Sequence, residues 1–111
     1  MTSTDSKGLP LEGVVVLDVT RVVAGPYSAM ILADLGATVI KIENPNDPDY
    51  TRNFPPFTKT DKESAFFAQY NRNKLGMTLD LKNAEGKKTL KQLVKKAVSY
   101  THLTLPTTPY V

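Results

Sequence analysis

The sequence predicts an α/β fold, namely the N-terminal part of a Rossmann-like parallel sheet with flanking helices, incomplete within this chain. Residues 14–17 are four consecutive apolar residues, mostly β-branched, a pattern typical of a strand buried on both faces. Residues 37–43 predict a second strand, and a segment with helical spacing lies between the two. A strand, a helix and a strand in this order predict a βαβ crossover between parallel strands.

The helix of this crossover is predicted from its two ends and from its apolar spacing. Gly25 lets the backbone turn sharply, and Pro26 suits a first helical turn because its missing N–H costs nothing there. Gly36 is a good helix stop. The apolar residues that recur at helical spacing are Tyr27, Met30, Ile31 and Leu35.

The segment after the second strand has a different composition. Residues 44–62 hold four prolines among polar residues and predict a long loop. Loops longer than about 12–15 residues in a compact domain are usually functional or disordered. Residues 63–70 predict a short helix, and residues 71–74 a polar turn. Apolar and polar residues alternate over residues 77–82, which predicts a third strand.

The last predicted helix carries much of the positive charge. Asn83 can cap it, with Glu85 in its first turn. Its lysines contribute much of the net charge of +3, and we interpret them as a solvated face. A nucleic-acid surface would need stacking aromatic residues among them, and this run has none. One face carries apolar residues at helical spacing, namely Leu90, Leu93, Val94 and Ala97.

The two ends of the chain are expected to lie outside the folded unit. Residues 1–10 predict a flexible lead-in without a secretory signal, and residues 11–97 form the domain. Residues 98–111 contain no Asp, Glu, Lys or Arg. Residues 98–103 can be encoded by a sequence that resembles the transposon-end adapter of sequencing libraries. We therefore expect a non-native tail after Ala97; the rival interpretation is a true strand followed by a proline-containing end.

Composition limits the chemistry and the location of the protein. There is no cysteine, which excludes disulfides and thiolate metal sites. The single histidine, His102, lies in the suspect tail, so neither a histidine-based triad nor a metal site is predicted. Asp18, Asp34 and Asp80 are expected to be solvated or capping, and none is assigned as a nucleophile. No apolar run approaches the ~20 residues that span a bilayer. We expect a cytoplasmic protein with no membrane and no nucleic-acid partner.

The first strand–helix loop, residues 20–27, is the candidate ligand site. In open α/β sheets ligands bind outside the carboxyl ends of the strands, and helix N-termini attract anions. A phosphate-bearing or nucleotide-like ligand is the first expectation, and an ordinary βα connection is the alternative. The loop lacks the G-x-G-x-x-G fingerprint, although Glu43 stands where a dinucleotide fold places its ribose-binding acid. A nicotinamide-dependent oxidoreductase domain is therefore a less favoured alternative.

Seven short motifs occur in a specific order and spacing. They are Pro-Leu-Glu-Gly at 10–13, Val-Leu-Asp at 16–18, Thr-Arg-Val-Val-Ala-Gly-Pro-Tyr at 20–27, Asp-Leu-Gly-Ala at 34–37, Val-Ile-Lys-Ile-Glu at 39–43, Asn-Arg-Asn-Lys at 71–74 and Leu-Asp-Leu-Lys at 79–82. Together they resemble the N-terminus of a class III CoA-transferase of the CaiB/BaiF type, and the resemblance covers residues 9–97.

This resemblance implies an enzyme that transfers coenzyme A from an acyl-CoA thioester to a carboxylic acid through an aspartyl-CoA intermediate. The family's Asp nucleophile lies downstream of the matched region, so no catalytic residue is expected here and the fragment alone should be inactive. Coenzyme A is a substrate, no tightly bound cofactor is implied, and the parent would be a homodimer of interlocked subunits. The alternative is a stand-alone CoA- or nucleotide-binding module without catalysis.

The resemblance also assigns binding residues. It places Val23 and Ala24 beside coenzyme A, and it gives further contacts to Leu79, Asp80, Leu81 and Lys82. Lys82 could pair with a phosphate as a point charge; the alternative is a solvated lysine at a strand end. Many family members carry an Arg after the second strand, where this chain has Asn44.

Overall fold

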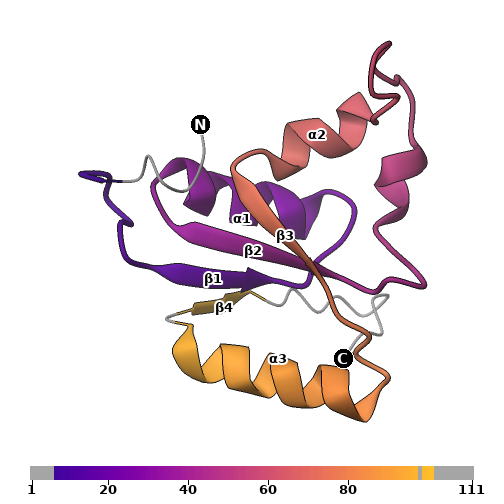
Figure 1. Cartoon of the computed structure of the whole chain (residues 1–111). Coiled ribbons are helices and arrows are strands. Elements are labelled where there is room, and N and C mark those ends of the chain that lie inside the picture. Colours follow the sequence, from indigo (N-terminus) through magenta and orange to yellow (C-terminus); the bar gives the residue numbers. More distant parts are fainter. Residues whose placement is uncertain (1–6, 98, 102–111) are drawn as a thin grey trace.

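A computed structural model describes residues 7–97 and 99–101, and it shows a four-stranded parallel sheet with helices on both faces (Figure 1). The strand order is β3-β2-β1-β4. The predicted parallel α/β fold is confirmed. The elements in chain order are β1 (Val15–Asp18), α1 (Ala24–Asp34), β2 (Thr38–Glu43), the 3-10 helix η2 (Tyr50–Asn53), α2 (Ala65–Asn71), β3 (Lys74–Thr78), α3 (Ala84–Lys96) and β4 (Ser99–Thr101).

Two apolar clusters hold the helices on opposite faces of the sheet. Helices α1 and α2 lie on one side of the sheet and α3 on the other (Figure 1). Val16 belongs to the cluster beneath α1, together with Ala29 and Ala33. The next residue, Leu17, belongs to the cluster beneath α3, against which Leu90 packs. Successive strand side chains point to opposite faces, so β1 supplies both layers of the core.

Two alanines of helix α1 belong to the core, whereas three of its large side chains are exposed. Ala29 and Ala33 are buried, whereas Tyr27, Ile31 and Leu35 are each more than two-fifths exposed. Of the four apolar residues that mark this helix in the sequence, only Met30 is buried. Ala29 and Ala33 join the core cluster with Val16 and Val39, and Leu32 packs against that cluster.

The C-terminus of α1 ends in a Schellman motif at the predicted glycine. Gly36 has φ 109°, and its N–H donates to the carbonyl of Ala33 at 3.0 Å. The N–H of Ala37 donates to the carbonyl of Leu32, also at 3.0 Å. This pairing satisfies carbonyls that the helix end leaves free, and a left-handed residue is required for it. The predicted helix stop is confirmed with its mechanism.

The third strand begins earlier than predicted. The alternation at residues 77–82 predicts a strand there, but β3 covers Lys74–Thr78 and residues 79–82 form the loop before α3. The predicted polar turn at residues 71–74 therefore includes the first strand residue. Lys74 looks like a turn residue in the sequence because its partner, Asp18, is far away along the chain.

The remaining predicted elements are close to the observed ones. Residues 63–70 predict the short helix α2, which covers Ala65–Asn71. The long loop after β2 contains η2. The amide oxygen of Asn83 accepts the Glu85 N–H at 2.8 Å, which confirms the predicted cap of α3.

The apolar face of α3 is only partly as predicted. Leu90, Leu93 and Ala97 pack toward the core, but Val94 is exposed. The five lysines of this helix are exposed, as predicted: Lys87, Lys88, Lys91, Lys95 and Lys96.

The end of the described chain pairs with the sheet. Strand β4 lies parallel to β1, with Val16 opposite Ser99 and Asp18 opposite Thr101. This is the strand of the rival interpretation, and the origin of residues 98–111 stays a prediction. His102 and most of the lead-in, residues 1–6, lie outside the described residues. Within the described ranges, no helix has the length and hydropathy needed to cross a membrane.

Candidate functional site

The loop between β1 and α1 lies at the carboxyl edge of the sheet, and two of its residues, Val22 and Gly25, have a constrained backbone. Val22 has φ 74°, a left-handed conformation that β-branched residues rarely adopt. Gly25 does not have a positive φ, so the sharp turn predicted there lies instead at Val22. A Cβ on Gly25 would lie 2.3 Å from the Cβ of Thr20. Gly25 is therefore required by the close packing of the first turn of α1 against Thr20.

A buried ion pair lies beneath this loop. The Lys74 ammonium lies 2.8 Å from the Asp18 carboxylate, and their side chains are 2% and 0% exposed. Lys74 also donates to the carbonyl of Pro26 at 3.0 Å and to the side chain of Asn71 at 2.8 Å. Burial lowers the pKa of the Lys74 ammonium, while the charge and hydrogen bond of Asp18 oppose that shift. The solvated or capping role expected for Asp18 is therefore wrong.

The Asp18 carboxylate also organises the start of the loop. Its Oδ1 accepts the backbone N–H of Thr20 at 2.9 Å and the Thr20 hydroxyl. Asp18 is the last residue of β1 and lies opposite Lys41 of β2 in the strand register. The buried carboxylate thus joins β1, the loop and, through Lys74, β3.

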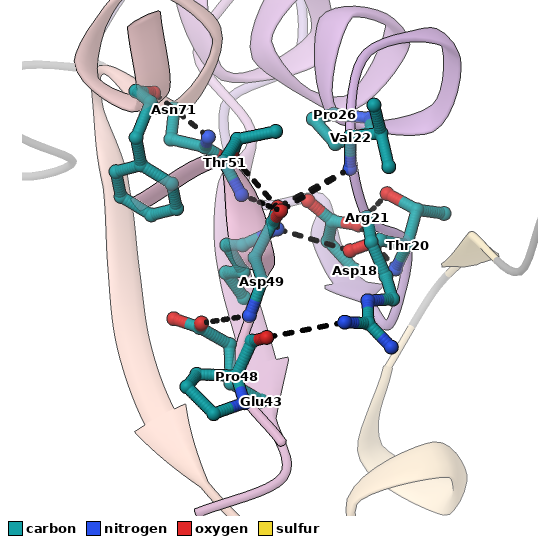
Figure 2. A network of polar contacts seen from close by, with 12 residues as sticks. Asp18, Thr20, Arg21, Val22, Pro26, Glu43, Pro48, Asp49, Thr51 and Asn71 are labelled. Carbon is teal, nitrogen blue, oxygen red and sulfur yellow. Dashed lines mark hydrogen bonds and ion pairs between the residues drawn. The ribbon is translucent and has the colours of Figure 1, made fainter. Parts of the chain in front are cut away.

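A second buried ion pair joins β2 to the long loop. The Lys41 ammonium lies 3.2 Å from the Asp49 carboxylate, with side chains 3% and 1% exposed. Lys41 also donates to the carbonyl of Thr20 at 3.0 Å. Burial would raise the pKa of Asp49, but the Lys41 charge and hydrogen bonds from Thr51 lower it below its ordinary value. Figure 2 shows Asp49 pointing at the loop that carries Thr20, Arg21 and Val22.

Glu43 is occupied in a similar way. Its carboxylate receives two hydrogen bonds from the Arg52 guanidinium, at 2.6 and 3.1 Å, and one from the Asp49 N–H at 2.9 Å. Burial acts to raise the pKa of Glu43, but Arg52 and the Asp49 N–H hold it below its ordinary value. These hydrogen bonds attach the long loop to the end of β2. Because they occupy the Glu43 carboxylate, they disfavour its ribose-binding role in a nicotinamide site.

The two remaining aspartates, Asp34 and Asp80, each accept hydrogen bonds from other groups of the chain. Asp34, at the end of α1, pairs with Arg72 at 2.7 Å, and a hydrogen bond from that guanidinium lowers its pKa. Asp80 accepts the backbone N–H of Lys82 at 3.0 Å in the loop before α3, but the N-cap of that helix is Asn83, so the capping role is not seen at Asp80. Asn44 accepts the N–H of Asn46 at 2.8 Å, so this residue closes a turn directly after β2.

The residues assigned to coenzyme A fall in two segments. Val23 is the N-cap of α1, and Ala24 is its exposed first residue. Residues 79–82 follow β3 and lead into α3; within them Leu79 packs on the apolar cluster and Lys82 is exposed. The two segments follow the carboxyl ends of parallel strands separated by β2, so they lie at one edge of the sheet. Their contact with a ligand stays a prediction.

Sequence reasoning missed two features of this edge. One is Asp49, whose carboxylate reaches the β1–α1 loop from a proline-rich segment. The other is Gly86 in the first turn of α3, where a Cβ would lie 2.0 Å from the carbonyl oxygen of Asp80. A glycine inside a helical pattern is the available signal for such a close approach. Gly86 thus lets α3 begin directly against the predicted Leu79–Lys82 contact segment.

A surface depression of about 330 Å³ lies apart from these segments. It includes none of the residues assigned to coenzyme A and is built from the long loop and α2. Its lining residues are Arg52, Asp61, Lys62, Glu63, Ser64 and Phe67.

The architecture defines a Rossmann-like α/β unit, a class that binds ligands at the carboxyl ends of its strands. The chain belongs to a specific family within this class: a sequence model of CoA-transferase family III matches residues 11–100. The resemblance drawn from the seven motifs is therefore confirmed.

Several characterised relatives are similar in sequence. The succinyl-CoA:glutarate CoA-transferase of Homo sapiens is 49% identical over 85 residues, which are 76% of this chain and 19% of that protein. The succinate–glutarate CoA-transferase of Agrobacterium fabrum is 39% identical over 102 residues, covering 87% of this chain and 26% of the relative. The chain thus spans about a fifth to a quarter of the length of these relatives.

Solved structures show the same fold. A CAIB/BAIF family protein from Brucella suis is 36% identical with a TM-score of 0.75, and the match covers 83% of this chain and 25% of that one. The protein Rv3272 from Mycobacterium tuberculosis is 34% identical with a TM-score of 0.78, covering 89% and 28%.

Proposed function

We propose that this chain is the N-terminal part of an enzyme that transfers coenzyme A from an acyl-CoA thioester to a carboxylic acid. The observation that carries the proposal is the family match over residues 11–100, joined to a fold that brings both predicted CoA segments to one sheet edge. The relatives are CoA-transferases by name, and the chain covers only part of each.

The proposed chemistry is covalent catalysis by a carboxylate. An Asp of the full-length enzyme attacks the thioester carbonyl, which gives an enzyme-bound anhydride and releases the CoA thiolate. The thiolate then attacks the aspartyl carbonyl, giving the aspartyl-CoA thioester and freeing the donor acid. The acceptor carboxylate reverses these two steps. This nucleophile lies downstream of the matched region, so residues 11–97 contribute binding.

The binding role assigned to this chain follows from its groups at the edge. Val23 and Ala24 open helix α1, whose first N–H groups present positive potential to an anion. Lys82 offers a mobile positive charge to a phosphate. Asn44 replaces a charged Arg with a neutral amide, and its side chain is used in a turn. We therefore expect Lys82 to be the main charge that this chain supplies to the nucleotide end of coenzyme A.

The direct test is trapping of the aspartyl thioester in the full-length enzyme. Incubation with an acyl-CoA and hydroxylamine should convert one Asp to a hydroxamate and abolish activity. Glutarate, mesaconate and oxalate are the first acceptors to assay, because relatives of this chain are named for them. Absence of trapping, together with no transfer from a panel of acyl-CoAs, would overturn the proposal.

The binding role has its own test. Lys82→Gln should weaken CoA binding by about tenfold, the size of one charge-assisted contact, whereas Lys88→Gln on the exposed face of α3 should not change it. CoA binding without any trapping would favour the alternative, a CoA-binding module without catalysis.

The family also supports three further proposals about the parent. We propose a homodimer of interlocked subunits, no tightly bound cofactor and a cytoplasmic location. Light scattering and the absorption spectrum of the purified full-length enzyme test the first two, and cell fractionation tests the third. We also propose that residues 98–111 are non-native; uninterrupted genomic sequence through the Ala97 codon would overturn this.

A further inference from the structure

The most constrained backbone point of the candidate site is Val22. Its φ of 74° is a left-handed conformation that crowds a β-branched side chain. The next two residues, Val23 and Ala24, are among those assigned to coenzyme A. Whatever holds Val22 in this conformation therefore sets the direction in which Val23 and Ala24 present their backbone.

Asp49 is the group that holds Val22. The Val22 N–H donates to both carboxylate oxygens, at 3.3 and 3.4 Å, across 27 positions of the chain. Asp49 is only 3% exposed, so water competes little for this bond. Both contacts are longer than an ordinary hydrogen bond, because the Val22 N–H is shared between the two oxygens of a charged acceptor.

The carboxylate of Asp49 is itself fixed by the surrounding elements (Figure 2). The Lys41 ammonium lies 3.2 Å from its Oδ2. Thr51 donates its N–H to Oδ1 at 3.1 Å and its hydroxyl at 2.8 Å. The backbone N–H of Asp49 is held by Glu43 at 2.9 Å. Asp49 therefore has little freedom to follow the loop, and the loop must conform to it.

We propose that Asp49 is a positioning residue for the CoA-binding loop: it holds Val22 at positive φ and thereby aims Val23 and Ala24 at the ligand. This inference rests on the proposed CoA function. Asp49 does not touch the ligand in this scheme and acts only through Val22.

The test compares Asp49→Asn with Asp61→Asn, an exposed aspartate on the same long loop. Two quantities are measured on the chain: amide hydrogen exchange at Val22 and the dissociation constant of CoA. Asp49→Asn should speed exchange at Val22 and raise the dissociation constant, each by about tenfold. Asp61→Asn should leave both unchanged.

A rescue experiment separates positioning from general stability. Glycine adopts positive φ about as readily as negative φ, so Val22→Gly should restore most of the CoA affinity lost in Asp49→Asn. A merely structural role of Asp49 predicts no rescue. If Asp49→Asn does not melt cooperatively, Thr51→Val replaces it. This variant removes the hydrogen bond from the Thr51 hydroxyl to the Asp49 carboxylate but keeps the one from the Thr51 N–H, so it should weaken CoA binding by about threefold.

The outcomes are distinct. If the unchanged chain binds CoA and Asp49→Asn, or Thr51→Val in its place, binds it with the same dissociation constant, this inference is overturned and the proposed function is not. Slow exchange at Val22 in Asp49→Asn, or failed rescue by Val22→Gly, overturns it as well. If neither the unchanged chain nor Asp61→Asn binds CoA, the proposed binding role itself is contradicted.

Discussion

The buried pair between Lys74 and Asp18 should dominate the response of this fold to mutation. Lys74→Met removes an ammonium that is 2% exposed and leaves a carboxylate that is 0% exposed without its counter-charge. Breaking a buried pair in this way costs about 3–5 kcal/mol. Pro26 and Asn71 lose a donor at the same time. Domains of this size have about 5–15 kcal/mol of stability in total, so the effect is large.

The reverse change, Asp18→Asn, should cost less. In the unchanged chain the Asp18 carboxylate accepts the Thr20 N–H at 2.9 Å, and the amide oxygen of the variant can still accept it. Burial already lowers the pKa of Lys74, and Asp18 opposes that shift, so without Asp18 the ammonium loses its proton more readily. We expect a loss of about 1–3 kcal/mol, the size of a buried polar group with imperfect partners.

The double variant tests this reasoning. Because Lys74→Met leaves the Asp18 carboxylate buried without a counter-charge, adding Asp18→Asn removes that charge and should recover part of the loss. The coupling between the two changes should therefore be at least about 1–3 kcal/mol. Urea unfolding at neutral pH, followed by circular dichroism, measures all three variants beside Lys88→Met as an exposed control. Additive single effects, or a loss below about 1 kcal/mol in Lys74→Met, would refute the reasoning.

Three further predictions follow from the same structure. The depressed pKa of Glu43 means that its contribution is complete above the ordinary value of 4.5 and is lost as pH falls through the folded-state value. Acid should therefore lower the unfolding free energy, and urea titrations of Glu43→Gln should show a shallower dependence; equal slopes would count against this. Gly25→Ala should destabilise the chain by at least about 1–3 kcal/mol, whereas Gly76→Ala, which has open space at the Cβ, should not; equal melting temperatures would contradict the crowding at Gly25. Asp47→Asn removes an ion pair with Arg21 in which Asp47 is 68% exposed, and it should change the unfolding free energy by less than about 1 kcal/mol; a larger loss in urea titration would show that this surface pair matters more than its exposure indicates.

Local patterns predicted the elements well where local physics decides them. The apolar run at residues 14–17, the glycine at position 36 and the cap at Asn83 each act within a few residues of themselves. The order strand, helix, strand predicts a crossover between parallel strands, and the observed strand pairing confirms it.

Features that depend on distant partners were not predictable in this way. Lys74 lies 56 positions from Asp18, so a strand residue was interpreted as part of a turn, and a buried carboxylate as a solvated one. Gly25 was correctly placed at the helix start, but for the wrong reason, since its requirement comes from Thr20. Asp49 gave no signal beyond a Thr two positions later, a weak turn pattern.

The candidate ligand contacts came from a different source. Val23, Ala24 and residues 79–82 were assigned by the resemblance to a family, which the sequence model of that family confirms. The structure adds the reason why the two segments can serve one ligand, because both follow carboxyl ends of parallel strands. It also adds the network of Asp18, Lys41 and Asp49, which holds the loop between β1 and α1.

The most direct test of the account is a titration of the isotope-labelled chain with coenzyme A, followed by amide chemical shifts. The account predicts saturable shifts concentrated at Val23, Ala24 and residues 79–82, with weaker ones at Val22. No shifts at saturating coenzyme A, or shifts confined to the depression lined by Arg52 and Phe67, would contradict it.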